Sequence, residues 1–452
     1  MNPTIFKIKQ GDENLSSHSG LALAGALLFK TNLTKKVNQV EIVNKPTISN
    51  GDVVKSMIGL CCIGKPDFDA IEPMRGQPFF SQALGVANCP SSPTIRQRLD
   101  GAKGQLDRII KEESALLVKK TASQITPIKT ECHGNVCPLD IDVTPHDNSG
   151  TKKEGVSCTY KKVDGFAPIN AYLGQEGYMV NTELREGKQH CQKGTPEFLA
   201  ASIAYAKQIT NQPILVRLDS GNDSKENIRV CIQGGAEFLI KRNLRKETPD
   251  AWLEIAKKNG TPEQVREGKI RWLGEIWIQV DGVDEPVRVV FDVVERTITA
   301  KGEALLFPEI EADTYWVSLK DSPKSVVELY HDHGTSEQFH SEIKSDMNLE
   351  RLPSGKFSTN SFVLLLGLFA YNILRLCGQE SLQECPEETR PAWRGKVTRR
   401  RVRTVMQDLI YLAGRIVKRS RSFILSFGRY CPWGMVWQRL YKKFSDLPVA
   451  VG

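Results

Sequence analysis

The chain lacks long apolar runs, internal repeats, low-complexity tracts and any regular cysteine framework. Its eleven cysteines are odd in number and irregularly spaced, which excludes the disulfide scaffold of a small secreted domain. The two apolar runs, residues 21–29 and 362–371, are too short to span a bilayer, and neither a basic stretch nor a small-residue cleavage site frames the first. We therefore expect no membrane segment, no export signal and reduced thiols in a cytoplasm.

Negative charge is scarce near the C-terminal end. Residues 391–452 hold 14 Lys and Arg against Asp408 and Asp446, a net charge of +12. Since the whole chain carries +8, the other residues together carry −4. A positive block on a mildly acidic body favours a polyanionic partner, because phosphate backbones release counterions to basic groups. A solvated basic surface explains the charge equally well on its own.

The composition is that of a soluble globular protein, with 40% apolar and 25% charged residues, and 452 residues suffice for two or three domains. Apolar periodicity first predicts helices, at residues 15–29, 51–59, 79–86 and 93–120. The strands and helix predicted after them are strands 139–144, 166–174 and 177–185, helix 196–208 and strand 214–218. This order predicts a mixed α/β sheet.

Acidic side chains stand at the ends of two predicted strands. Asp140 and Asp142 alternate with apolar residues in the first, the pattern of a half-buried strand, and Asp219 follows the last. The carboxyl end of a strand is where α/β folds place ligands. More than one hundred residues separate Gly221 from Tyr330, too many for a loop, and their alternating segments predict an inserted β-rich subdomain.

The segment after this insertion supplies a third carboxylate. Its polar residues Tyr330, His333, Glu337 and Lys344 follow one another at steps of three, four and seven, so they can share one helical face. Three acids on two strands and a helix can hold divalent metal ions, which take hard oxygen ligands. Taken singly, each acid also fits a structural role, as a turn acceptor or a first-turn helix residue.

The spacing Tyr-x2-His-x3-Glu-x6-Lys resembles the Tyr-Arg-Glu-Lys signature of DDE transposases encoded by bacterial insertion sequences, with His333 where Arg is usual. The stretch VRLDSGNDSKENI is similar to the second acidic strand of that family, and the resemblance covers roughly residues 130–380. It implies an RNase H-like α/β core, a mixed sheet flanked by helices, interrupted by the β-rich insertion. It also implies cut-and-paste DNA transposition, in which metal-dependent hydrolysis and transesterification cleave and join DNA at the element's ends.

The resemblance assigns roles to individual residues. Catalysis and metal binding fall to Asp142, Asp219 and Glu337, with Mg²⁺ as the cofactor and Mn²⁺ as an alternative. The family pattern of an acid two residues before Thr or Ser favours Asp142 on the first strand, and Asp140 stays open as the ligand instead. The residues expected to contact the end phosphates are Tyr330, His333 and Lys344. The charge of a histidine at this place would depend on pH.

The predicted domain layout has five parts. These are an N-terminal helical, DNA-end-binding domain at 1–130, the first part of the catalytic core at 131–235, a β-rich insertion at 236–320, the second part of the core at 321–385 and a basic C-terminal segment at 386–452. The N-terminal helices fit a helix-turn-helix or a plain bundle equally well. In the basic segment the residues expected to bind DNA are Arg399, Arg400, Arg401 and Arg403.

The expected partners are double-stranded DNA, comprising the terminal inverted repeats and the target, and a second copy of the chain in a synaptic homodimer. The expected location is the bacterial cytoplasm, at the nucleoid, with no membrane partner. Two other functions remain open from the sequence. One is an RNase H-like nuclease that does not join strands, and the other is a catalytically inactive DNA-binding protein.

Overall fold

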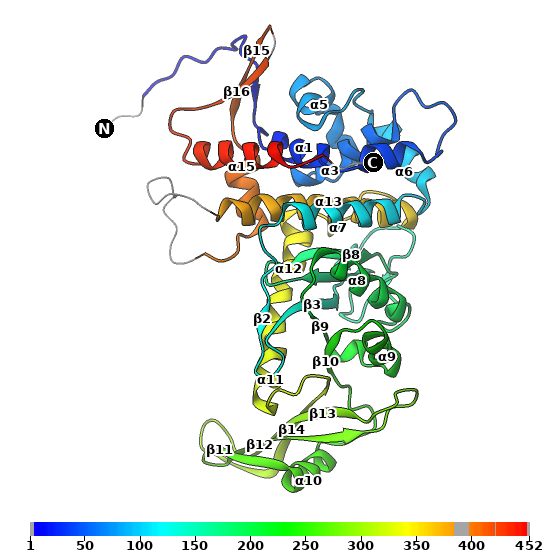
Figure 1. Cartoon of the computed structure of the whole chain (residues 1–452), viewed down its shortest axis with the longest axis vertical. Helices are drawn as coiled ribbons and strands as arrows, with labels where there is room; N and C mark the ends of the chain where they lie inside the picture. The colour runs from blue at the N-terminus through cyan, green and yellow to red at the C-terminus, as the bar shows by residue number, and fades with distance from the viewer. Residues whose placement is uncertain (1–3, 384–396, 421, 450–452) are drawn as a thin grey trace.

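The structure, a computed structural model, describes residues 4–383, 397–420 and 422–449. The molecule is elongated, with the N-terminal helices at one end, a large mixed sheet in the middle and the strands of the insertion at the other end (Figure 1). A mixed sheet with helices packed against it confirms the predicted α/β class.

The middle of the ten-stranded sheet is the part that the sequence predicted best. Strands β3, β7 and β8 form an antiparallel meander, and β9 and β10 continue the sheet in parallel with β3. Helices α8 and α9 are the connections that lead to β9 and β10. The bounds are β2 Ile128–Lys129, which pairs with β3, β3 Asn135–Val143, β7 Ile169–Leu173, β8 Tyr178–Glu183, α8 Thr195–Ile209, β9 Ile214–Leu218, α9 Lys225–Gln233 and β10 Glu237–Lys241.

The insertion extends this same sheet outward from β10. The added strands are β14 Ala304–Val317, β13 Val287–Ile298, β12 Lys269–Ile278 and β11 Gly260–Arg266, in that spatial order and all antiparallel. The sequence prediction of strands alone missed α10 (Pro249–Asn259), which packs against them. Two features of the sequence mark the start of α10. The Thr248 hydroxyl accepts the Ala251 N–H at 3.2 Å, and Pro249 occupies the first helical position.

Both faces of β3 are covered by protein. Leu139 and Ile141 belong to the apolar cluster that includes side chains of α8 and α9, while Val136 on the opposite face packs with α11 (Pro323–His331). The prediction of a half-buried strand is therefore wrong, because α11 covers the acidic face. As a result, Asp140 is only 2% exposed.

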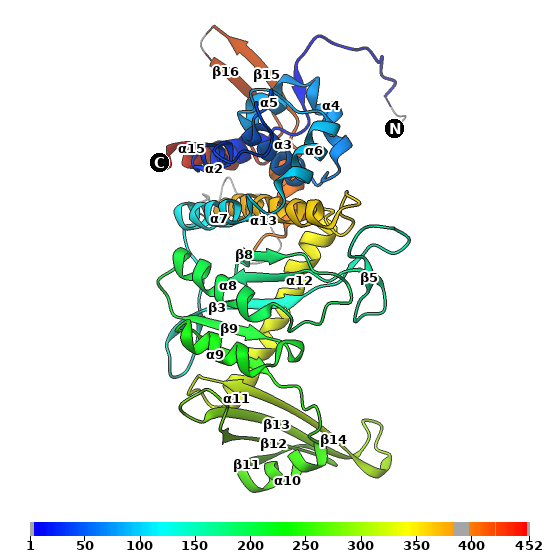
Figure 2. The ribbon, with the colours of Figure 1, turned by 90° about the vertical axis from the view of Figure 1, so that its right-hand side faces the viewer.

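A long helix connects the sheet to the N-terminal helices. α13 (Phe357–Ser381) packs on β8 and on two N-terminal helices, α3 and α7 (Figure 2). By length and composition α13 is apolar enough to cross a membrane, and 94% of its most apolar window is buried inside the protein. An apolar surface that is covered on all sides in this way is typical of a core helix.

One of the helices predicted in the N-terminal region is divided in the structure. The segment 93–120 is two helices, α6 (Ser92–Ala102) and α7 (Asp107–Thr121), because Lys103 and Gly104 have left-handed φ values of 42° and 81°. The Ser91 hydroxyl caps α6 by accepting the Thr94 N–H. The remaining helices of this region are α1 Leu21–Phe29, α2 Leu33–Asn38, α3 Asn50–Cys62, α4 Glu72–Arg75 and α5 Pro78–Leu84.

The C-terminal segment folds back onto these helices. β15 (Gly414–Arg419) and β16 (Ser422–Phe427) form a hairpin, and β1 (Leu15–Ser16), predicted as helix, pairs with β15. α15 (Gly434–Asp446) packs against α1 and α13. Segments far apart in the sequence thus build one end of the molecule together (Figure 1). Two short helical turns precede the hairpin, α14 Val402–Val405 and η6 Met406–Ile410.

Candidate active site

Asp142 and Asp219 lie side by side at the ends of two neighbouring parallel strands. Ile141 of β3 is opposite Leu218 of β9, and each aspartate is the next residue along its strand. Because adjacent strands are about 4.8 Å apart, the backbones of the two aspartates are neighbours. Carboxylate oxygens at such an edge suit a hard divalent cation.

Asp140 has a different role, in a buried ion pair. Its carboxylate accepts two bonds from the Arg217 guanidinium, at 2.6 and 2.8 Å, and Arg217 also donates to the Leu329 carbonyl of α11 at 2.8 Å. Since side chains alternate along a strand, Asp142 and Asp219, two residues further on, share this face. The side chain of Asp142 is 27% exposed and that of Asp140 only 3%. The structure thus favours Asp142 as the accessible carboxylate.

The charges of both aspartates contribute to the raised pKa values of two tyrosine hydroxyls. The pKa of Tyr160 is raised to about 12, first by burial of its hydroxyl and then by Asp142 and Asp219. Burial also comes first among the causes that raise the pKa of Tyr330, followed by the same two carboxylates. The ring of Tyr330 packs on Tyr315, with centroids 4.9 Å apart. Negative charge is therefore concentrated at this edge of the sheet, where a cation would bind.

The segment predicted as one regular helix consists of four short helical pieces. After α11 come the 3₁₀ turn η3 (Asp332–Thr335), α12 (Ser336–Ser341) and the π-helical turn η4 (Glu342–Asp346), the yellow run along the sheet in Figure 1. These pieces have different numbers of residues per turn. The prediction that four residues occupy one face of a regular helix is therefore wrong, although the run does cover the face that carries the aspartates.

Glu337 is exposed in the first turn of α12. His340, three residues further on, places its Nε2 3.5 Å from Asp142 Oδ2, within ion-pair distance but without hydrogen-bond geometry. Glu337 therefore stands one helical turn from a direct contact with Asp142. Within residues 4–383, 397–420 and 422–449, no three His, Cys, Asp or Glu side chains lie close enough to hold a metal ion. The structure thus brings two of the predicted carboxylates together and leaves Glu337 outside that group.

The residues predicted to contact phosphates lie in different surroundings. Lys344 donates to the Pro145 carbonyl at 2.8 Å and pairs with Glu350 at 2.9 Å. Because Pro145 is three residues beyond Asp142, Lys344 lies at the same end of β3. The side chain of His333 lies outside the described part of the structure.

Of the four arginines predicted to bind DNA, Arg400 is buried and Arg399 is only 15% exposed. Arg399 pairs with Glu342, whose carboxylate is 1% exposed, and Arg400 pairs with Asp408. The side chain of Arg400 is itself 2% exposed, and its Cζ lies 4.4 Å from the centroid of the Trp433 ring. The prediction of DNA contacts for Arg400 disagrees with this burial, because a phosphate has no access to its guanidinium here.

Arg401 and Arg403 are more accessible. Their side chains are 50% and 58% exposed, and both pair with Asp346 of η4, at 2.8 and 3.3 Å. Each guanidinium therefore keeps an open side that can contact a phosphate. The rest of the predicted basic stretch, residues 394–396, lies outside the described residues.

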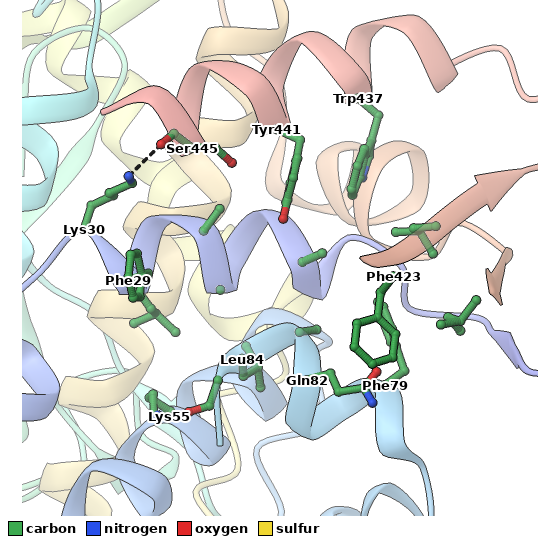
Figure 3. A pocket seen from close by; sticks show the side chains of 18 of the residues that line it. Phe29, Lys30, Lys55, Phe79, Gln82, Leu84, Phe423, Trp437, Tyr441 and Ser445 are labelled. Atoms are coloured by element: carbon green, nitrogen blue, oxygen red, sulfur yellow. Dashed lines mark hydrogen bonds between the residues drawn. The ribbon is translucent and has the colours of Figure 1, made fainter. Parts of the chain in front are cut away.

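A cavity of about 670 Å³ lies at the helical end of the molecule, away from the carboxylates (Figure 3). It is lined by parts of α1, α5, β16 and α15. Two of its lining residues, Trp437 and Tyr441, stack on each other with ring centroids 5.3 Å apart. Its described lining residues include no Asp or Glu. A hard divalent cation needs carboxylate or carbonyl oxygens, so the lining of this cavity suits such an ion less well than the strand ends do.

Sequence analysis missed Tyr160 as a residue of this site. Its hydroxyl donates to the carbonyl of Val143, the residue next to Asp142, at 3.2 Å. It lies in the turn that joins β5 and β6 of a small sheet inserted between β3 and β7. This sheet consists of β4 His146–Asp147, β5 Ser157–Cys158 and β6 Asp164–Phe166. The sequence signal for this insert is the connection between the predicted strands 139–144 and 166–174, which is longer than a hairpin loop.

Comparison with known families identifies the class of protein. A family described as "Transposase DDE domain group 1" matches residues 5–449, nearly the whole chain. The chain belongs to this family of DDE transposases, which generally use divalent metal ions. Among solved structures, the chain is similar to a piggyBac transposase synaptic complex with hairpin DNA, at 11% identity and a TM-score of 0.40, covering 81% of this chain and 77% of that one. No curated protein matches the chain.

Proposed function

We propose that this transposase cuts its own insertion sequence out of DNA and joins it to a new site, with Asp142, Asp219 and Glu337 as the ligands of Mg²⁺. The observation that carries the proposal is the strand register that makes Asp142 and Asp219 neighbours at the open end of β3 and β9. Helices on both faces of a mixed sheet support an RNase H-like core. Glu337 is included because its helix already contacts Asp142 through His340.

Divalent ions bound here would supply a Lewis acid for the scissile phosphate and an activated water or 3′-hydroxyl. The protein's own contribution is to fix the two carboxylates. Asp142 Oδ1 accepts the Val143 N–H at 2.7 Å, and Asp219 Oδ1 accepts the Asn222 amide at 2.8 Å. Positioning and electrostatics carry most of the acceleration of phosphoryl transfer, so carboxylates held in this way suit the reaction.

The DNA would lie along the edge of the sheet that carries these residues. Tyr330, His333 and Lys344 would contact the phosphates of the element's ends, and the exposed sides of Arg401 and Arg403 would extend that contact. Lys344 would exchange its bond to Glu350 for a phosphate. If His333 contacts a phosphate, this contact weakens above about pH 6.5, where an ordinary histidine loses its charge.

The domain layout gives the remaining parts of the proposal. The N-terminal helices, residues 1–130, would bind the terminal inverted repeats, and the core at 131–235 and 321–385 would carry out the chemistry. Two element ends would require two copies of the chain, so the synaptic complex would be a homodimer that also binds the target DNA. The source would be a bacterial insertion sequence, and the enzyme would act at the nucleoid.

A cleavage and integration assay tests the function. Purified protein is incubated with a duplex that carries the inverted repeat flanking its own gene, together with a target plasmid, in Mg²⁺, in Mn²⁺ or with a chelator. We expect cleavage at the repeat boundary and integrated product with either metal, and neither with the chelator. Asp142→Asn is the matched control, since it should bind the repeat and leave it intact.

Other outcomes favour the other functions. Metal-dependent cleavage without integrated product would make the protein a nuclease that does not join strands. Binding of the repeat by the wild-type chain with no cleavage in either metal would make it a DNA-binding protein without catalytic activity. Full activity of Asp142→Asn would overturn the assignment of the site.

A further inference from the structure

The turn between β5 and β6 is a rigid feature beside the carboxylates. The Thr159 N–H and hydroxyl both donate to the Val163 carbonyl at 2.9 Å, and the Lys162 N–H donates to the Thr159 carbonyl at 2.9 Å. Lys162 has a φ of 60°, which closes the turn tightly. Five residues, 159–163, thus hold one another in place without a ligand.

The small sheet that carries this turn is itself anchored to the core. The Glu154 N–H donates to the Gly355 carbonyl at 2.9 Å, and the Asn148 side chain donates to the Glu350 carbonyl at 2.8 Å. Both acceptors belong to the segment between η4 and α13, so the small sheet is fixed beside the helical run that covers the aspartates (Figure 2). The turn therefore has a defined place relative to Asp142.

Within the turn, the two ends of one tyrosine have different surroundings. The Tyr160 hydroxyl reaches inward to the Val143 carbonyl at 3.2 Å, yet the residue as a whole is 65% exposed. This partly buried hydroxyl bond holds the ring in one direction, and the exposed ring offers a flat apolar face near Asp142 and Asp219. Lys161, with Nζ 5.9 Å from the ring centroid, and Lys162 are both exposed next to it.

We propose that the Tyr160–Lys162 turn is a nucleotide-binding subsite, in which the Tyr160 ring stacks on a nucleobase and Lys161 and Lys162 contact the adjoining phosphates. The inference deepens the proposed function and rests on it for the place of the scissile phosphate at Asp142 and Asp219. Aromatic rings with interleaved basic side chains bind single-stranded nucleic acid with little preference for sequence. The base must present an uncovered face, as it does at a strand end or in unpaired DNA.

The test is fluorescence of a single-stranded oligonucleotide that contains 2-aminopurine, whose emission falls when an aromatic ring stacks on it. We expect wild-type protein to quench the probe and Tyr160→Phe to keep part of the quenching, because it retains the ring but loses the bond to Val143 that holds it. Tyr160→Leu should lose the quenching and bind about fivefold to a hundredfold more weakly. The matched control is Trp277→Leu, which removes an aromatic residue of similar exposure, 62%, on β12 of the insertion and should change nothing.

A second variant keeps the test decisive if Tyr160→Leu is unstable. Lys161→Gln with Lys162→Gln changes exposed side chains only, and it should lower the log–log salt slope for single-stranded DNA by about 0.7 for each phosphate that the variant no longer binds. Unaltered quenching by a folded Tyr160→Leu or an unaltered slope in the lysine variant would overturn the subsite.

The subsite and the proposed function fail in distinguishable ways. If the wild-type protein cleaves element ends and Tyr160→Leu also cleaves and quenches normally, the proposed function stands and the subsite is overturned. If the wild-type protein quenches the probe through Tyr160 but cleaves no element end, the nucleotide site stands and the proposed transposition mechanism is overturned.

Discussion

At the scale of single residues, the two acids of β3 have different roles although they have the same pattern in the sequence. Asp140 is opposite Arg217 in the strand register and forms a buried pair with it, whereas Asp142 is at the end of the strand, beside Asp219. A buried charge needs its partner, because burial without one costs several kcal/mol. Substitutions at these positions should therefore separate stability from chemistry.

We predict that Asp140→Asn lowers the free energy of unfolding by about 3 kcal/mol, because it leaves the Arg217 guanidinium buried without a counter-charge. Asp142→Asn should change stability by less than about 0.5 kcal/mol and abolish metal-dependent cleavage, while binding of the repeat persists. Urea unfolding of each variant, followed by the cleavage assay, measures both effects. A stable and inactive Asp140→Asn beside an active Asp142→Asn would reverse the assignment.

His146 is a second residue with a measurable role. It is 1% exposed, and its pKa is lowered to about 3, first by burial and then by the charges of Lys344 and His340. The unfolded chain has an ordinary histidine pKa near 6.5. Below that pH the unfolded state binds a proton that the folded state does not bind, so folding becomes less favourable as the pH falls from about 6.5 toward 3.

We predict that the wild-type chain loses up to about 1.4 kcal/mol of stability per pH unit in this window relative to His146→Leu, which has no group to protonate. The measurement is urea unfolding of both proteins at about pH 7, 6 and 5. Comparing the two proteins at each pH cancels the contribution of the other titrating groups. A constant difference in stability across these pH values would contradict the prediction.

At the scale of elements, one buried carboxylate connects segments that are distant in the sequence. Glu342 of η4 pairs with Arg375 of α13 and with Arg399, and it accepts the Val402 N–H at 3.0 Å and the Tyr371 hydroxyl at 3.1 Å. The helical run over the candidate active site is thereby connected to both the core helix and the C-terminal segment. Part of the basic charge that favoured DNA binding in the sequence therefore stabilises the fold.

The β15–β16 hairpin carries basic side chains that remain exposed. We predict that Lys418→Gln with Arg419→Gln leaves stability unchanged and lowers the log–log salt slope of double-stranded DNA binding by about 0.9 for each phosphate that the removed charges had neutralised. Binding titrations over a range of salt concentrations measure the slope. The matched control is Lys301→Gln, an exposed lysine between β13 and β14 at the opposite end of the molecule, which should leave the slope unchanged.

The hairpin prediction has a clear contrary result. An unchanged slope in the double variant would mean that the hairpin does not face DNA. An equal fall in the Lys301→Gln control would mean that charge acts over the whole surface rather than at the hairpin.

At the scale of the whole molecule, the two ends of the chain build one structural unit. Leu440 and Phe444 of α15 are fully buried, and the side chain of Arg439 donates to the carbonyls of Glu380 and Ser381 at 3.2 and 3.3 Å. The C-terminal segment is therefore a structural part of the protein and not only a basic extension.

We predict that ending the chain after residue 383 produces an insoluble protein or one that melts several degrees lower, because α1 and α13 lose the apolar partner that α15 provides. A chain ending after residue 449, which keeps α15, is the control. Thermal unfolding and the soluble fraction measure the effect. A truncated chain with full stability and weaker DNA binding would instead support a purely DNA-binding role for this segment.

The sequence by itself determined the mixed α/β class, the place of the central strands and the family. Local patterns suffice for these, because apolar periodicity is set by the geometry of a strand or helix and β9 coincides with its prediction. The acidic residues at the strand ends could be located in the sequence for the same reason. Glu337 was predicted only through its spacing in the resemblance to DDE transposases, and the structure leaves it outside the pair formed by Asp142 and Asp219.

Only the tertiary structure decided which acids meet and which basic residues are accessible. The choice between Asp140 and Asp142 depends on the parallel register of β3 and β9, whose residues are about 75 positions apart, and on the cover that α11 provides. Tyr160 reaches the site through an insert that no local pattern marks, and Arg400 is buried against the ring of Trp433, which belongs to a later segment of the chain. Burial and pairing are set by contacts between distant segments, and periodicity within one segment cannot specify them.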